Sequence, residues 1–255
     1  MGNKNILVSV IVAVYNGNSN HYNIARTIES VLNQTYKNIE LIVIDGASTD
    51  GTIEIIKKYA KKGKISYWVS EKDSGIYDAM NKGIYVAKGE FFYFLNSDDY
   101  LVDDKVITNV TDSLRNNTDL DIVYGFVEYY QKDKNNGRIV GDISINNCRL
   151  GLHAPHQGTF FKRKVVAECN FFDISYKSAA DLDFFCKCSK KSYKIKDLNC
   201  VIAVYSIGGM SSNRRIAFSE SSKIILKHFG FYWYLRYIII RNFRYYLKKV
   251  VEFIK

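Results

Sequence analysis

Proline is almost absent from this sequence: Pro155 is the only one in 255 residues. The composition of 47% hydrophobic and 24% charged residues is that of an ordinary globular protein, which excludes a disordered chain and a collagen-like repeat. The length suffices for one sizeable domain, or for one domain with an appendage.

Cysteine spacings typical of metal or redox sites are also missing. The five cysteines include no CxxC pair, and only one lysine separates Cys186 from Cys188, so we expect reduced thiols in a cytosolic protein. No run of about 18 uncharged apolar residues occurs, which predicts no transmembrane helix. The first apolar run, Leu7–Tyr15, starts late and is rich in β-branched residues, so it indicates a strand rather than a signal peptide.

Glycine-rich phosphate-binding loops are absent as well. No GxGxxG follows the first apolar run, and no GxxxxGK[ST] occurs anywhere in the chain. These absences disfavour a dehydrogenase and a P-loop phosphotransferase. A nucleotide held through a metal ion fits the sequence better.

What the chain does contain is an alternation of strand-like and helix-like segments. Continuous apolar runs predict buried strands at 8–14, 40–44, 65–69 and 91–95, and helical spacing predicts helices at 23–34, 53–59, 76–87 and 103–116. Further strands are expected at 121–130, 158–161 and 193–205, a polar hairpin at 131–137 and a helix at 181–189. This order predicts an α/β fold with a mostly parallel central sheet and helices on both faces.

Acidic residues follow several of these strands. Asp45 ends the second strand, and Asp98 and Asp99 follow the fourth. Ligands of open parallel sheets bind beyond the carboxyl ends of the strands, and adjacent carboxylates suit Mg²⁺ or Mn²⁺ shared with a substrate's phosphates. Alternatively, Asp98 and Asp99 form a solvated turn that starts the next helix, and Asp45 is an ordinary turn residue.

Several separate motifs resemble family 2 glycosyltransferases with the GT-A fold. They are VSVIVAVYN at 8–16, SVLNQTY at 30–36 and ELIVIDGASTDGT at 40–52. The segments DSGIYDAMNKG at 73–83 and GEFFYFLNSDD at 89–99 resemble the subgroup found in bacterial O-antigen and capsule clusters. The resemblance covers roughly residues 6–210, and we take 211–255 as a separate C-terminal helical segment.

The resemblance implies roles for individual residues. It implies a nucleotide site in which Tyr15 and Asp45 contact the uracil and Asp98 lies near the ribose. It also implies a metal ligand and a catalytic base. Further side chains are expected to contact the donor or the acceptor. The residues so implied are, for the nucleotide, Ala13, Tyr15, Asp45 and Asp98; for Mn²⁺ or Mg²⁺, Asp99; for the base, Asp181; and for further contacts, Asp78, Lys82, His156 and Asp183.

Two positions depart from the family pattern. Ala180 stands where the family has the Glu of a Glu-Asp pair, and Asn96 replaces the first acid of the extended metal motif. Asp183 is a rival for the base, and Asp181 alone would be interpreted as a helix N-cap. His156 is expected either to contact a diphosphate or acceptor, or to be an ordinary polar residue beside Pro155 whose hydrogen bonds are made within the protein.

The net charge of +10 is unevenly distributed. Residues 223–255 contain eight Lys and Arg side chains against Glu252, a net charge of +7, which leaves +3 for residues 1–222. Apolar residues recur at helical spacing through Ile239, Phe243 and Leu247, which is typical of an amphipathic helix lying on an anionic membrane. The alternative is a helix that packs on its own domain or on a second subunit.

Together these observations predict an inverting glycosyltransferase that uses a nucleotide-sugar, expected to be UDP-linked, and a glycan or lipid-linked acceptor in cell-surface polysaccharide synthesis. We expect it in the cytoplasm, on the inner face of the plasma membrane. One alternative is a metal-dependent nucleotidyltransferase, but segment 16–20 has no basic residue to clamp a phosphate. Another is a non-enzymatic membrane-binding or nucleic-acid-binding module, which would need none of these aspartates. No nucleic-acid partner is expected.

Overall fold

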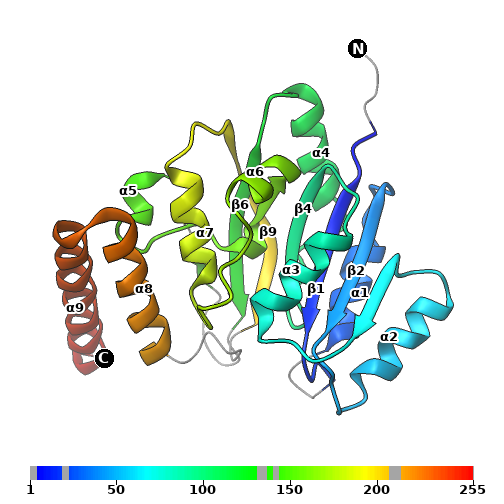
Figure 1. Ribbon diagram of the computed structural model, residues 1–255, viewed down its shortest axis with the longest axis horizontal. Helices are drawn as coiled ribbons and strands as arrows, with labels where there is room; N and C mark the ends of the chain where they lie inside the picture. The colour runs from blue at the N-terminus through cyan, green and yellow to red at the C-terminus, as the bar shows by residue number, and fades with distance from the viewer. Residues whose placement is uncertain (1–4, 19–22, 131–136, 140–143, 207–213, 255) are drawn as a thin grey trace.

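The computed structural model describes residues 5–18, 23–130, 137–139, 144–206 and 214–254. A single central sheet has the strand order β3-β2-β1-β4-β8-β6-β9-β5, with β7 paired to β6 (Figure 1). The expected α/β fold is confirmed.

The N-terminal half is parallel throughout. Strand β1 pairs with β2 on one side and with β4 on the other, and β2 pairs with β3. Their carboxyl ends therefore meet at one edge of the sheet. The strands and the helices between them are β1 (Val8–Val14), α1 (Ile24–Leu32), β2 (Ile39–Asp45), α2 (Thr52–Lys61), β3 (Tyr67–Ser70), α3 (Ile76–Val86) and β4 (Phe91–Asn96).

The second half is mixed, because β8 runs antiparallel to both β4 and β6, whereas β9 runs parallel to β6. Its elements are β5 (Tyr100–Leu101), α4 (Val106–Asn116), β6 (Ile122–Tyr130), β7 (Gly137–Ile139), α5 (Ile145–Cys148), a 3-10 turn η1 (His156–Gly158), β8 (Thr159–Lys162), α6 (Arg163–Glu168), α7 (Ala180–Ser189) and β9 (Ile195–Ser206).

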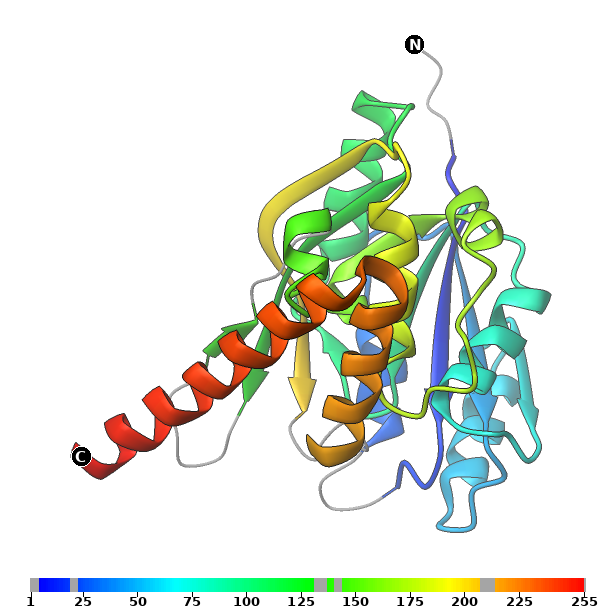
Figure 2. The same cartoon turned by 60° about the vertical axis from the view of Figure 1, so that its left-hand side comes forward.

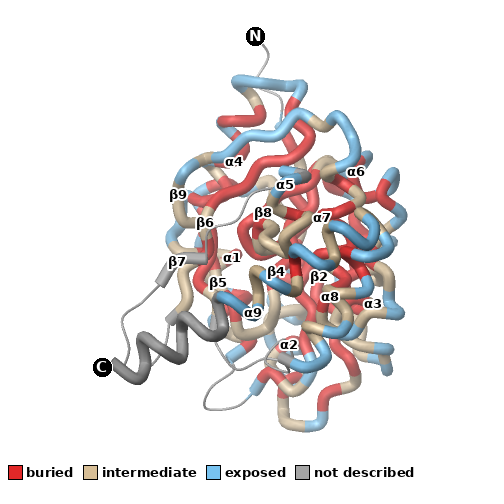
Figure 3. The backbone as a smooth tube through the Cα atoms, turned by 90° about the vertical axis from the view of Figure 1, so that its left-hand side faces the viewer, coloured by how far each residue is buried: buried red, intermediate tan, exposed pale blue. Residues whose placement is uncertain are grey.

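Helices cover both faces, as expected. Alternate residues of the central strands enter two separate cores: Ile11 and Phe94 pack with α3 and α7, whereas Val10 and Tyr93 pack with α1 and α4. All seven residues of β1 are buried, which explains its uninterrupted apolar sequence. Buried strands between more exposed helices are visible in Figure 3.

Two helices end the chain. Helix α8 (Arg214–Phe229) packs on α7, and Gly230, with φ of 83°, reverses the chain into α9 (Phe231–Ile254). Figure 2 shows the C-terminal part of α9 projecting from the body. Within the ranges listed above, no helix combines the length and apolarity needed to cross a bilayer.

Most boundaries fall within three residues of those expected from sequence. The helix expected to start at Asp103 starts at Val106, because residues 100–101 first pair with β9. Most of the hairpin expected at 131–137 lies outside the described residues.

Candidate active site

Asp45 lies at the carboxyl end of β2 and is fully buried. Its carboxylate accepts hydrogen bonds from the Ser48 N–H at 3.0 Å, from the Ser48 hydroxyl and from the Ser70 hydroxyl at 2.6 Å. Asp45 is therefore fixed in place by the loop that follows its own strand and by the end of β3.

Asp73, to which the sequence analysis gave no role, lies against this loop. A Cβ added at Gly46 would be 2.6 Å from Asp73 Oδ2, so a larger residue there would displace this carboxylate. Burial raises the pKa of Asp73, with Asp78 and Asp45 adding repulsion against the lowering effects of the Gly75 N–H and Lys82. Acidic side chains thus gather at this edge of the sheet.

Asp78 and Lys82 lie one turn apart on α3. Asp78 Oδ2 accepts from the Ser74 N–H at 2.9 Å, and Lys82 Nζ lies 3.9 Å from the same oxygen and 2.8 Å from Glu71. Lys82 also donates to the Lys72 carbonyl at 2.9 Å. These two expected contact residues line the loop between β3 and α3.

Ala13 and Tyr15 mark the end of β1. Ala13 is buried between Ile44 of β2 and Asn96 of β4 in the register of the sheet. Tyr15 lies just beyond the strand with 65% of its surface exposed. Its ring is therefore available to a ligand at the same edge where Asp45 ends β2.

Asp98 and Asp99 follow β4 at this edge. Asp98 is half-buried, and burial raises its pKa to about 6. Asp99 is fully buried, and its Oδ2 accepts a 3.0 Å hydrogen bond from Gln157 Nε2. The neighbouring Asn96 Oδ1 is buried without a hydrogen-bond partner. Adjacent carboxylates and an unsatisfied amide oxygen are the oxygen ligands that Mn²⁺ and Mg²⁺ prefer.

These residues do not form a complete metal cage by themselves. Within the described ranges, no group of three His, Cys, Asp or Glu side chains is arranged to hold a metal ion. A cation here would need oxygen ligands from a bound substrate, which is how Mg²⁺ usually binds beside phosphates.

Asp181 lies in the first turn of α7, surrounded by three side chains from distant segments. Oδ1 accepts from the Tyr77 hydroxyl at 3.2 Å, and Oδ2 lies 3.3 Å from His153 Nε2 and 3.4 Å from His156 Nδ1. Burial tends to raise the pKa of Asp181, but the charge and hydrogen bonds of the two histidines outweigh it and lower the pKa. Asp181 is therefore held as a carboxylate.

The N-cap interpretation of Asp181 is wrong. The helix begins at Ala180, its N-cap is Ala179 without a side-chain bond, and Asp181 instead accepts from the Leu182 N–H at 2.9 Å. Tyr77 packs against Phe172 in the core and also contacts Asp181.

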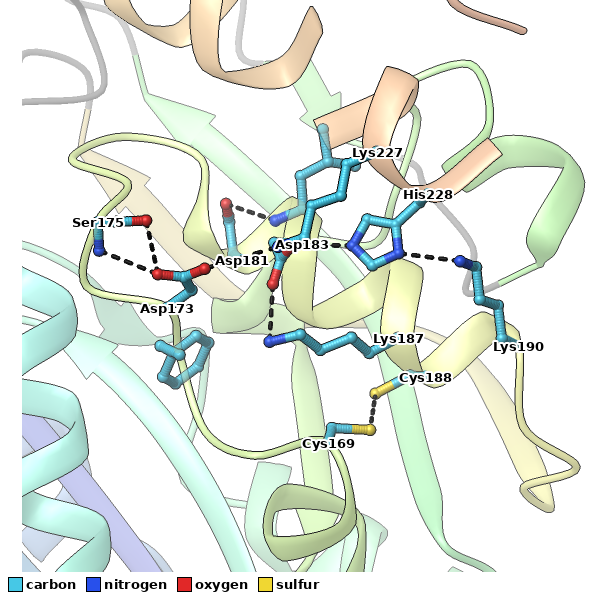
Figure 4. A network of polar contacts seen from close by, with 12 residues as sticks. Cys169, Asp173, Ser175, Asp181, Asp183, Lys187, Cys188, Lys190, Lys227 and His228 are labelled. Atoms are coloured by element: carbon cyan, nitrogen blue, oxygen red, sulfur yellow. Dashed lines mark hydrogen bonds and ion pairs between the residues drawn. The ribbon is translucent and has the colours of Figure 1, made fainter. Parts of the chain in front are cut away.

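Asp183 has other partners, and Figure 4 shows it beside Lys187, Lys227 and His228. It is fully buried and bonds Lys187 Nζ at 2.7 Å, Lys227 Nζ at 3.1 Å and His228 Nε2 at 2.8 Å. Burial acts to raise its pKa, but these partners lower it. The two aspartates expected to compete for one role therefore lie in different surroundings.

The turn η1 connects the two groups of carboxylates. His156 contacts Asp181, and the next residue, Gln157, contacts Asp99. His156 Nε2 and His153 Nδ1 are buried without partners in the structure. Sequence reasoning missed His153 and Gln157, whose partners are distant in sequence.

Comparison with solved structures identifies the fold. Among solved structures, that of Staphylococcus aureus TarS 1–349 in complex with UDP-GlcNAc matches with a TM-score of 0.71 at 19% identity, covering 88% of this chain and 66% of that chain. The mannosyltransferase PcManGT from Pyrobaculum calidifontis, in complex with GDP-Man and Mn²⁺, matches with a TM-score of 0.63 at 20% identity, covering 88% and 63%. The fold is that of the GT-A glycosyltransferases.

The family follows from the sequence. The model of glycosyl transferase family 2 matches residues 9–174, and the chain belongs to that family. The uncharacterized glycosyltransferase Rv1514c of Mycobacterium tuberculosis is 32% identical over 213 residues, 81% of this chain and 78% of the relative. Escherichia coli WfaP, a "UDP-Glc:alpha-D-GlcNAc-diphosphoundecaprenol beta-1,3-glucosyltransferase", is 42% identical over 104 residues, 41% of this chain and 40% of WfaP.

Proposed function

We propose that this glycosyltransferase transfers a sugar, with inversion, from a nucleotide donor to the hydroxyl of a glycan acceptor. One observation carries the proposal: the consecutive residues His156 and Gln157 contact Asp181 and Asp99 respectively. The carboxylate of Asp181, the proposed base, is thereby held at a fixed relation to the carboxylates that would bind the cation of the donor's diphosphate.

The chemical step needs one base. As the acceptor oxygen bonds to the anomeric carbon, the bond from that carbon to the diphosphate oxygen breaks, and the acceptor's proton passes to Asp181. The histidines and Tyr77 hold this carboxylate ionised and oriented before the acceptor arrives. A single displacement inverts the anomeric centre and needs no covalent intermediate on a second carboxylate, unlike a retaining glycosidase.

Asp99, with Asp98 beside it, would hold Mn²⁺ or Mg²⁺, and Asn96 Oδ1 supplies a further oxygen. When bound, the cation would neutralise the negative charge that develops on the departing diphosphate. Burial disfavours the ionised form of Asp98, so a nearby positive charge would stabilise it. Gln157 keeps Asp99 oriented through its 3.0 Å hydrogen bond.

We propose a UDP-sugar as the donor. The exposed ring of Tyr15 would lie against the uracil, with Ala13 and Asp45 beside it and Asp98 near the ribose. TarS, in its complex with UDP-GlcNAc, supports uridine, whereas PcManGT has GDP-Man. Asp78, Lys82 and His156 are proposed to contact the transferred sugar or the acceptor.

A lipid-linked glycan is the proposed acceptor, in the synthesis of cell-surface polysaccharide. The printed name of WfaP, with its diphosphoundecaprenol acceptor, supports this class. Such an acceptor would place the enzyme on the cytoplasmic face of the plasma membrane. Asp183 lies in the contact with α8 and is proposed to support α7 rather than to touch the acceptor.

The test is a screen of nucleotide-sugars with purified protein. Thermal stabilisation and slow hydrolysis are measured with each donor, with and without Mn²⁺. We expect a UDP-sugar to stabilise the protein and to release UDP only with the metal. Release of pyrophosphate from a nucleoside triphosphate and a sugar phosphate would instead identify a nucleotidyltransferase, and absence of both reactions would contradict the proposal.

A further inference from the structure

Helix α9 presents an apolar stripe that the described chain leaves uncovered. Phe231, Leu235, Ile239 and Phe243 follow one another at intervals of four residues, and they are 64%, 43%, 66% and 63% exposed. Tyr232 lies beside them with similar exposure, and Asn242 is the polar residue on this side. Large exposed apolar patches on a monomer mark sites of interaction.

The opposite side of α9 already has a partner. Trp233, Tyr234, Tyr237 and Ile238 pack against the core that contains α7. Arg149 lies over the Trp233 ring at 4.6 Å, and Gly151 leaves room for the Tyr237 ring. Because this packing fixes the rotation of the helix, the stripe cannot turn inward without breaking the core.

The charge of this region indicates what covers the stripe. Residues 223–255 carry a net charge of +7, whereas residues 1–222 carry +3. Arg236 is exposed at the edge of the stripe, beside Tyr232. A second copy of the chain would bring a further +7 against this region, whereas an anionic lipid surface would compensate it.

We propose that α9 lies in the plane of an anionic phospholipid bilayer, with the Phe231–Phe243 stripe inserted between the headgroups. Aromatic rings beside basic residues suit this boundary, where one end of the side chain is apolar and the other hydrated. The helix lies on the surface and does not cross the bilayer.

This docking has a consequence for the site, and that part rests on the proposed function. Helix α8, which packs against α9, is bonded to α7 through Asp183 with Lys227 and His228. Asp181 lies two residues before Asp183 on the same helix. A bilayer beneath α9 would therefore hold the base at a fixed height and orientation above the lipid that carries the acceptor.

The experiment measures flotation of the full-length protein with phosphatidylcholine vesicles that contain or lack phosphatidylglycerol. The stripe variant is Ile239→Glu/Phe243→Glu, and the matched control is Ile195→Glu, an exposed isoleucine on β9 outside the α8–α9 pair. Phe231→Ser/Leu235→Ser is a second stripe variant without added charge. Circular dichroism and thermal unfolding verify the fold of each.

We expect the wild-type chain and the control to float with anionic vesicles, and both stripe variants to bind at least about tenfold more weakly, since each buried apolar side chain contributes on the order of tenfold. Neutral vesicles or high salt should weaken wild-type binding. Two results would overturn the proposal. One is equal vesicle binding by the stripe variants and the control. The other is a wild-type chain that forms a dimer without binding vesicles, together with stripe variants that are monomeric. No donor or acceptor is present, so the result is independent of the proposed function.

Discussion

His228 on α8 donates a 2.8 Å hydrogen bond from Nε2 to the buried carboxylate of Asp183 on α7. Lys190 Nζ donates a 3.0 Å hydrogen bond to Nδ1, the other ring nitrogen of His228. A neutral imidazole with its proton on Nε2 makes both contacts. The C-terminal helices are thereby joined to the helix that carries Asp181 by buried polar bonds as well as by apolar packing.

This junction predicts a pH dependence of stability. The pKa of Asp183 is lower in the folded chain than its ordinary value of 3.8, so its contribution is fully present above that value and is lost as the pH falls through the folded-state pKa. Asp183→Asn should cost about 2 kcal/mol at neutral pH, because it removes the buried carboxylate that the partly exposed Lys187 and the exposed Lys227 contact. Urea unfolding at pH 7 and pH 3 measures both effects: the variant should lose less stability than wild type on acidification. An equal loss in both proteins would contradict the assignment.

Asp181→Asn should lower kcat by about 10²–10⁴-fold, which is the usual contribution of a general base. The amide keeps the shape of the side chain but cannot take a proton from the acceptor. Donor affinity, measured by thermal shift with the nucleotide-sugar, should stay within about twofold of wild type. Asp173→Asn is the control; this half-buried loop aspartate is bonded to Ser175 and lies 3.7 Å from Lys227. Wild-type turnover by Asp181→Asn would remove this residue from the chemistry.

Asp99→Ala should abolish metal-dependent transfer while leaving the protein folded. The change removes a carboxylate expected to bind the cation and frees the Gln157 amide that it holds. Calorimetric titration with Mn²⁺ and UDP should show no binding of the metal to the variant. Asp104→Ala changes an exposed acid shortly after this loop and should behave as wild type. A variant with normal Mn²⁺ binding and turnover would show that Asp99 only supports the loop.

Glu220→Ala should slow the reaction, although the Glu220 side chain is not expected to contact the substrate. The Glu220 carboxylate accepts from three consecutive backbone N–H groups, those of Lys177 at 2.8 Å, Ser178 at 2.8 Å and Ala179 at 3.1 Å. These groups lead directly into α7, so their release should loosen the position of Asp181. We expect kcat to fall about tenfold with little change in the donor's KM. Glu220→Gln, which retains one acceptor oxygen, should recover part of the loss, and Ser219→Ala should have no effect; a change in donor KM alone would contradict a positioning role.

Much of the fold was predictable, because the strands that form its centre are buried on both faces. Val8–Val14 was predicted to the residue, since an uninterrupted β-branched run has few other places in a globular protein. The second half was harder. Whether β8 runs parallel or antiparallel to β4 depends on long-range packing, and a four-residue strand gives no sign of its direction.

The candidate site was predictable where side chains follow strands. Asp45, Asp98 and Asp99 occur at carboxyl ends that the sheet brings to one edge. His153 and Gln157 were missed because their partners are 28 and 58 residues away in sequence, and no local pattern records such distances. Asp181 and Asp183 are two residues apart on one helix, and only the fold shows that Asp181 meets His153 and His156 whereas Asp183 meets α8.

The short turn η1 has a consequence for how such an enzyme can change. Since neighbouring residues of one backbone segment contact both Asp181 and Asp99, a single peptide link would act as the spacer between the proposed acceptor half and the proposed donor half of the site. Loops on either side can then be replaced to accept other sugars while the separation of the two reacting groups is preserved.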